Sequence, residues 1–143
     1  MRQTAKENFM DFISIRIITD ELKRLVAFYE QITGTSATWY TEDFAELETA
    51  SCTIAMAHRR TIELFAAGAA RPADNHSVIL EFRVADVDAD YRRLASVVGK
   101  VVQEPTTMPW GNRSLLFRDP DGSLVNLFTP VTPDAIKKFD KRR

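Results

Sequence analysis

The first candidate for chemistry is a single amide within an apolar stretch, LVNLF at residues 124–128. The preceding DPDG sequence at 119–122 places proline and glycine where a tight turn between two strands uses them. An amide without hydrogen-bond partners in an apolar setting costs about 2–7 kcal/mol, so Asn126 should face a polar group, a cavity or a ligand. The strand pattern predicts that Asn126 lines a cavity, while its two apolar neighbours pack beneath a helix.

Charged residues occur on two further predicted strands, residues 12–18 (FISIRII) and 79–84 (ILEFRV). β-Branched and aromatic residues favour strands, and one face of each segment is apolar enough to lie under a helix. The other face mixes charged and apolar side chains, which is typical of a cavity lining. The predicted lining residues are Phe12, Arg16, Ile79, Glu81 and Arg83. The two arginines have a structural alternative, because they could pair with Glu81 or with glutamates across the sheet.

Aromatic residues gather beside the second and third predicted strands of each unit. The clearest are Trp39, Phe44 and Trp110. Flat rings of this kind can hold a planar ligand, with the charged and amide groups supplying its orientation. Trp110 stands between Pro109, which stiffens the chain, and Gly111, which lets a ligand approach the backbone closely. The alternative for both tryptophans is packing in the core or in a dimer interface.

The chain contains the same pattern twice. In each copy a strand is followed by a capping aspartate, Asp20 or Asp86, then by a helical stripe and a closing glycine, Gly34 or Gly99. Three further strands follow in each copy, and the two tryptophans fall at corresponding places. The sequence therefore predicts one strand–helix–strand–strand–strand unit that occurs twice.

Length and composition limit the remaining possibilities. The 143 residues should form one domain, with module one at about 10–66, a linker at 67–77, module two at 78–130 and a C-terminal tail at 131–143. The net charge of −1 gives no reason to expect nucleic acid, and the basic cluster in the tail is predicted to be solvated. One cysteine, no leader sequence and no long apolar run predict a cytoplasmic protein without membrane contact.

These segments together resemble the vicinal oxygen chelate superfamily, which contains glyoxalase I, extradiol dioxygenases, fosfomycin-resistance enzymes and bleomycin-binding proteins. The resemblance is carried by residues 13–34, 80–94, 109–122 and 124–128. It implies an α+β fold of two tandem βαβββ modules, which form a cup-shaped mixed sheet with the helices outside. It also implies a homodimer.

The same resemblance identifies the positions that hold a divalent metal ion in the family's enzymes. They fall on Phe12, Ala55, Ile79 and Asn126. Family enzymes typically have His or Glu there, and a divalent site needs three or four O, N or S donors. Reading residues 61–65 (TIELF) as a ligand strand would add Glu63 but leave the first and third positions apolar. We therefore expect no metal, no other cofactor and no catalytic residue of the family's kind.

The bleomycin-binding members also lack these ligands and bind drug in the cleft, and PWG at 109–111 is similar to the motif of that branch. The first hypothesis is therefore a metal-independent protein that binds an aromatic or antibiotic-like small molecule in the cup and acts by sequestration. The second is an enzyme of the superfamily, either metal-independent with Glu81 or Glu63 as general base, or a lyase or dioxygenase whose metal site lies elsewhere. The third is a dimeric module whose cup is filled by its own side chains.

Overall fold

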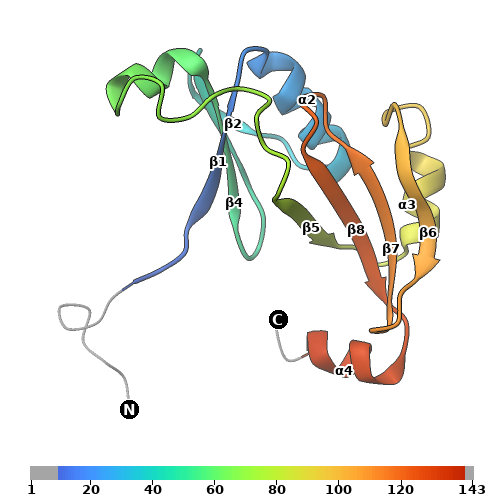
Figure 1. Ribbon diagram of the computed structural model, residues 1–143. Coiled ribbons are helices and arrows are strands. Elements are labelled where there is room, and N and C mark those ends of the chain that lie inside the picture. Colours follow the sequence, from blue (N-terminus) through green and yellow to red (C-terminus); the bar gives the residue numbers. More distant parts are fainter. Residues whose placement is uncertain (1–9, 141–143) are drawn as a thin grey trace.

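The computed structural model describes residues 10–140 and contains two modules with the same order of elements (Figure 1). The first comprises β1 (Ser14–Thr19), α2 (Leu22–Thr33), β2 (Thr38–Thr41), β3 (Phe44–Glu48) and β4 (Thr53–His58). The second comprises β5 (Ile79–Arg83), α3 (Val87–Arg93), β6 (Val101–Thr107), β7 (Asn112–Arg118) and β8 (Leu124–Pro130). A 3-10 helix, η1 (Arg59–Leu64), follows module one, and α4 (Pro133–Asp140) follows module two. The predicted α+β fold of two βαβββ modules is confirmed.

Each module forms its own four-stranded mixed sheet, in the order β1-β4-β3-β2 and β5-β8-β7-β6. The first and last strands of a module run parallel, and the remaining pairs are antiparallel. The chain crosses from η1 to β5 between the two sheets (Figure 1). The cup therefore consists of two separate sheets, with β1 and β5 each at an edge.

Helix α2 forms because its apolar residues recur at helical spacing and all face inward. The predicted stripe is buried, and it comprises Leu22, Leu25, Val26, Tyr29 and Ile32. Gly34 ends the helix at φ 69°, a left-handed conformation that glycine adopts without a steric penalty. The predicted cap at Asp20 is wrong. Glu21 occupies the N-cap position without a side-chain hydrogen bond, and Asp20 instead pairs with Arg59 across 2.8 Å.

The two modules share one hydrophobic core. Phe28 of α2 meets Phe117 of β7 edge-to-face at 6.1 Å, and Tyr29 contacts Phe82 of β5 at 6.5 Å. The Tyr29 hydroxyl donates a 2.6 Å hydrogen bond to Asp119 in the turn before β8. Burial raises the pKa of the Asp119 carboxyl, although hydrogen bonds from Tyr29 and from backbone amides act in the opposite direction. Helix α2 therefore connects the modules through both apolar and polar contacts.

Helix α3 is shorter and less buried than α2. Asp86 caps it as predicted, since its side chain accepts a hydrogen bond from the Ala89 amide. The helix ends at Arg93 rather than near Gly99, and the Arg93 guanidinium donates to the carbonyls of Gln31 and Ile32 at the end of α2. Module two is thus tied to α2 at this end as well.

The segment after β8 contains a helix, in which Lys137 and Lys138 are exposed, as predicted for the basic cluster. Residues 133–140 form α4, which packs on β8 with Ala135 buried. Gly111 (φ 95°) makes this packing possible, because a Cβ there would lie 2.9 Å from the Ala135 Cβ. The last three basic residues of the tail lie outside the described residues. Within residues 10–140, no helix is long and apolar enough to cross a membrane.

Candidate functional site

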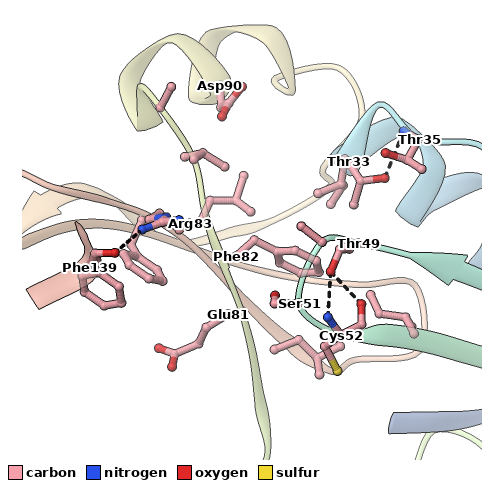
Figure 2. Close-up of a pocket in the computed structure, with 18 of the residues that line it drawn as sticks. Thr33, Thr35, Thr49, Ser51, Cys52, Glu81, Phe82, Arg83, Asp90 and Phe139 are labelled. Atoms are coloured by element: carbon pink, nitrogen blue, oxygen red, sulfur yellow. Dashed lines mark hydrogen bonds between the residues drawn. The ribbon is translucent and has the colours of Figure 1, made fainter. Parts of the chain in front are cut away.

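An open cavity of about 1340 Å³ runs along β5, between the two modules (Figure 2). Module two contributes β5, the start of α3, parts of β7 and β8, and the end of α4. Module one contributes the end of α2 and the hairpin between β3 and β4. Hydrogen bonds between Thr49 and Cys52 hold that hairpin, including a 2.6 Å bond from the Thr49 hydroxyl to the Cys52 carbonyl. The cavity therefore has a wall from each module.

The amide that interrupts the apolar strand has a specific partner. Asn126 lies directly opposite Glu81 in the β5–β8 pairing, and its Nδ2 donates a 2.9 Å hydrogen bond to Glu81 Oε2. Asn126 is only 8% exposed, and its Oδ1 has no hydrogen-bond partner. Glu81 is exposed and lines the cavity. Asn126 therefore faces a polar group, the Glu81 carboxylate, but Asn126 itself is not among the residues that line the cavity, so its predicted place in the lining is wrong.

Arg83 follows Glu81 on the same face of β5 but points to a different partner. Its guanidinium donates a 2.9 Å hydrogen bond to the Phe139 carbonyl and lies 5.9 Å from the Phe139 ring. Figure 2 shows Arg83 reaching α4, while the Glu81 carboxylate ends apart from that contact. The Phe139 ring also packs on Phe128 of β8 at 5.1 Å. Helix α4 is thereby fastened over part of the module-two face.

The predicted site residues of module one form a separate group. Arg16 lies 4.6 Å from the centre of the Phe44 ring and 5.4 Å from that of Phe65. Phe12 is exposed just before β1, and neither it nor Arg16, Trp39 or Phe44 lines the cavity. The cavity instead brings together Ile79, Glu81, Arg83 and Trp110 from the predicted set. No ion pair to a glutamate forms at Arg16 or Arg83 within residues 10–140, so the structural alternative for these arginines is wrong.

The two tryptophans differ in exposure and place. Trp110 lies in the turn before β7, is 66% exposed and lines the cavity. Trp39 lies in β2, is 41% exposed and lies outside the cavity. The alternative that the tryptophans pack in the core of the chain is therefore wrong for both. A contact in a dimer interface stays a prediction for each.

The strand register corrects one of the four positions that correspond to family metal ligands. Arg16 pairs with Ala55 and Arg83 with Phe128, so Ala55 corresponds to Phe128 rather than to Asn126. Ser14 of β1 occupies the place that Glu81 has in β5. Ser14 pairs with Thr53, just as Glu81 pairs with Asn126, so Thr53 is the counterpart of Asn126. A threonine hydroxyl is a poor substitute for the imidazole and carboxylate donors that divalent metals prefer.

The donor chemistry of these positions does not fit a metal ion. Phe12 and Ile79 offer only carbon, and the amide nitrogen of Asn126 is committed to Glu81. Glu63 lies in η1 and not on a strand. The described part of the chain contains no group of three or more His, Cys, Asp or Glu side chains placed to hold a metal.

Several lining residues were not identified from the sequence. They include Thr33, Cys52, Asp90, Lys138 and Phe139. Thr33 ends α2, Cys52 directly precedes β4 and Asp90 lies within α3. Tertiary packing brings them to the cavity, and no local pattern marks them. The last two lie in α4, where the four-residue spacing of Ala135 and Phe139 was an available signal for a packed helix.

Comparisons with known proteins agree with this architecture. A profile of the Glyoxalase/Bleomycin resistance protein/Dioxygenase superfamily matches residues 11–127. An uncharacterized protein, YraH of Bacillus subtilis, is 25% identical over 125 residues, which cover 83% of this chain and 98% of that protein.

Solved structures show the same fold. A glyoxalase/bleomycin resistance protein/dioxygenase family enzyme from Burkholderia phytofirmans is 17% identical with a TM-score of 0.76, over 85% of this chain and 100% of that chain. A protein described in the same superfamily terms from Nocardioides is 21% identical with a TM-score of 0.70, over 87% of this chain and 85% of that chain. The profile spans both modules, and the two modules have the same strand order. The chain therefore belongs to the glyoxalase/bleomycin resistance protein/dioxygenase superfamily.

Proposed function

We propose that the protein binds a planar aromatic small molecule in the cavity along β5 and acts by sequestration, without a metal ion. The observation that carries the proposal is the combination of an exposed Trp110 with the Glu81–Asn126 pair at the module-two side of one open cavity. Ligand sites commonly combine apolar and aromatic walls with a few fixed polar groups. The side chains at the family's metal positions are poor ligands for a divalent metal ion, and this supports an activity that needs no metal.

Tryptophan fluorescence tests this proposal. Planar aromatic compounds that bind in the cavity should quench Trp110 in a saturable way. Trp110→Ala should weaken binding by about 1–3 kcal/mol if stacking on an aromatic platform supplies part of the affinity. Trp39→Ala is the matched control, because Trp39 lies outside the cavity, and its affinity should equal that of the wild type. Equal losses in both variants, or no saturable quenching by any aromatic probe, would contradict the proposal.

A second candidate is a metal-independent enzyme in which Glu81 acts as general base. The Glu81 carboxylate is exposed to the cavity and fixed by Asn126, which favours this candidate over one based on Glu63 in η1. A general base must lie within hydrogen-bond reach of the proton that it removes. Mass spectrometry after long incubation separates the two candidates: sequestration returns the ligand unchanged, whereas an enzyme converts it in a Glu81-dependent reaction.

We also propose that the protein is a cytoplasmic homodimer whose interface includes strands of both modules. Strands β1 and β5 each lie at a sheet edge, and unpaired edges favour association. Large apolar side chains before these strands and outside the cavity lining are exposed, namely Met10, Phe12, Ile13 and Val78. Light scattering at micromolar concentration should give the mass of two chains, and the mass of one chain would contradict this assembly.

A further inference from the structure

In the Glu81–Asn126 pair, the amide nitrogen of Asn126 holds the Glu81 carboxylate, whereas the amide oxygen accepts no hydrogen bond among the described residues. Asn126 Nδ2 donates to Glu81 Oε2 at 2.9 Å, while Asn126 Oδ1 is buried and has no partner. Rotating the Asn126 side-chain amide by 180° would place its Oδ1 against the Glu81 carboxylate oxygen. The carboxylate therefore determines the orientation of the amide. A buried acceptor without a partner disfavours folding. The consequence of the pair for the cavity is that Asn126 positions the Glu81 side chain.

Within the described part of the chain, Glu81 forms no ion pair with a basic side chain. The ion pairs within residues 10–140 each join an arginine to an aspartate. Arg83, on the same face of β5, instead donates to the Phe139 carbonyl, and the Lys138 ammonium lies 5.3 Å from the Phe139 ring. Arg83 and Lys138 thus each contact Phe139, and Figure 2 shows Arg83 reaching that residue of α4. Among residues 10–140, Asn126 donates to the exposed Glu81 carboxylate, and the other lone pairs of this carboxylate accept no hydrogen bond.

The same cavity also contains apolar surface. Ile79 lies on the same face of β5 as Glu81 and is 46% exposed, and the exposed Trp110, in the turn before β7, lines the cavity as well. A carboxylate forms its strongest hydrogen bonds with charged N–H donors, and an aromatic face also attracts cations. The combination is complementary to a cationic nitrogen attached to an apolar body.

We infer that the ligand of this cavity carries a protonated amine or amidine next to a planar apolar group, and that Glu81, positioned by Asn126, selects for the charged nitrogen. The inference rests on the proposed small-molecule binding and adds the chemical class of the ligand. A carboxylate ligand would require one of the lining cations, Arg83, Arg93 or Lys138. The Arg83 guanidinium is engaged with the Phe139 carbonyl, and the Arg93 guanidinium with Asp90 and with two carbonyls at the end of α2. The positive nitrogen therefore lies at Glu81 and the planar group toward Trp110.

Three probes that share one ring test the inference: 4-nitrobenzylamine, 4-nitrobenzyl alcohol and 4-nitrobenzoate. Nitroaromatic rings quench tryptophan, and calorimetry gives the affinity independently. The amine, protonated near neutral pH, should bind at least about fivefold more tightly than the alcohol. Glu81→Gln should bring the two affinities together without weakening the alcohol. Glu63→Gln makes the same charge change in η1, outside the cavity, and should leave the preference intact.

The outcomes separate the inference from the proposed function. Saturable binding of the alcohol or the benzoate without preference for the amine would overturn the inference and leave small-molecule binding standing. An amine preference that survives Glu81→Gln, or that Glu63→Gln removes equally, would overturn the role of Glu81. Absence of saturable binding by all three probes would overturn both.

Discussion

The two modules have the same order of elements but contribute different parts of the molecule. Module one supplies α2, whose buried stripe forms the centre of the core and reaches Phe82 and Phe117 of module two. Module two supplies the polar pair and most of the cavity wall, and its helix α3 has a single buried residue, Val87. Backbone pairing fixes the topology of a repeat, whereas side chains decide what each face does. A duplicated unit can therefore specialise without changing its strand order.

The arginines at corresponding places in β1 and β5 show this divergence most clearly. Each guanidinium lies over a phenylalanine from the segment after its module's last strand, at 5.4 Å for Arg16 and Phe65 and 5.9 Å for Arg83 and Phe139. Only the second pair of the two includes a hydrogen bond, to the Phe139 carbonyl. One arginine is thus stacked between rings at the surface, while the other fastens α4 to the module-two face.

A core substitution in module two tests whether the modules form one cooperative unit. Phe117 is fully buried and meets Phe28 of α2, so Phe117→Ala should destabilise the fold by about 3–5 kcal/mol. The shared core predicts that both modules unfold together. Chemical denaturation followed at Trp39 and at Trp110, in the two single-tryptophan variants, should give coincident transitions. Loss of structure at Trp110 while Trp39 keeps its wild-type midpoint would contradict a shared core.

Removing one hydroxyl should destabilise the fold less than Phe117→Ala, and the loss should differ between Tyr29 of α2 and Tyr91 of α3. The Tyr29 hydroxyl is buried against Asp119, and this burial and the nearby carboxylate raise the pKa of the hydroxyl. Tyr29→Phe leaves the Asp119 carboxylate short of a hydrogen bond and should lower stability by about 1–3 kcal/mol. Tyr91→Phe removes an exposed bond to Glu104 and should leave the unfolding midpoint unchanged. Equal midpoints for the two variants would show that α2 does not connect the modules through this bond.

Much of the fold follows from local signals. The α2 stripe, the Gly34 ending and the Asp86 cap are each determined by residues within one turn of the helix. The turn at 119–122 forms as its sequence predicts, with a 3.0 Å bond from the Gly122 amide to the Asp119 carbonyl. Alternation along β8 also puts Asn126 on the same face as Glu81, because an amide and its apolar neighbours cannot exchange faces without stranding a polar group, although Glu81 rather than Asn126 lines the cavity.

The misplaced parts depend on long-range pairing. A register error of two residues in β4 preserves the alternation of faces, so the sequence pattern cannot distinguish Ala55 from Thr53 as the partner of a given residue in β1. Helix α4 was missed because its lysines suggest solvent, whereas Ala135 and Phe139 pack onto Gly111 and Phe128 from far along the chain. The cavity likewise depends on a hairpin of module one that approaches β5 only in the folded protein.

The central claim is that the ligand binds at β5 of module two. Backbone amide NMR during titration with the tightest-binding of the three nitroaromatic probes tests it most directly, because the shifts assign binding to one module. The account predicts saturable shifts concentrated in residues 79–83, 110–112 and 126–128, together with the side-chain amide of Asn126. Module-one segments outside the cavity, residues 39–44 and 55–57 together with Arg16, should remain unchanged, whereas the cavity hairpin at 48–54 can shift. Shifts concentrated around Arg16 and Phe44, or the absence of saturable shifts at β5, would contradict a ligand site on module two.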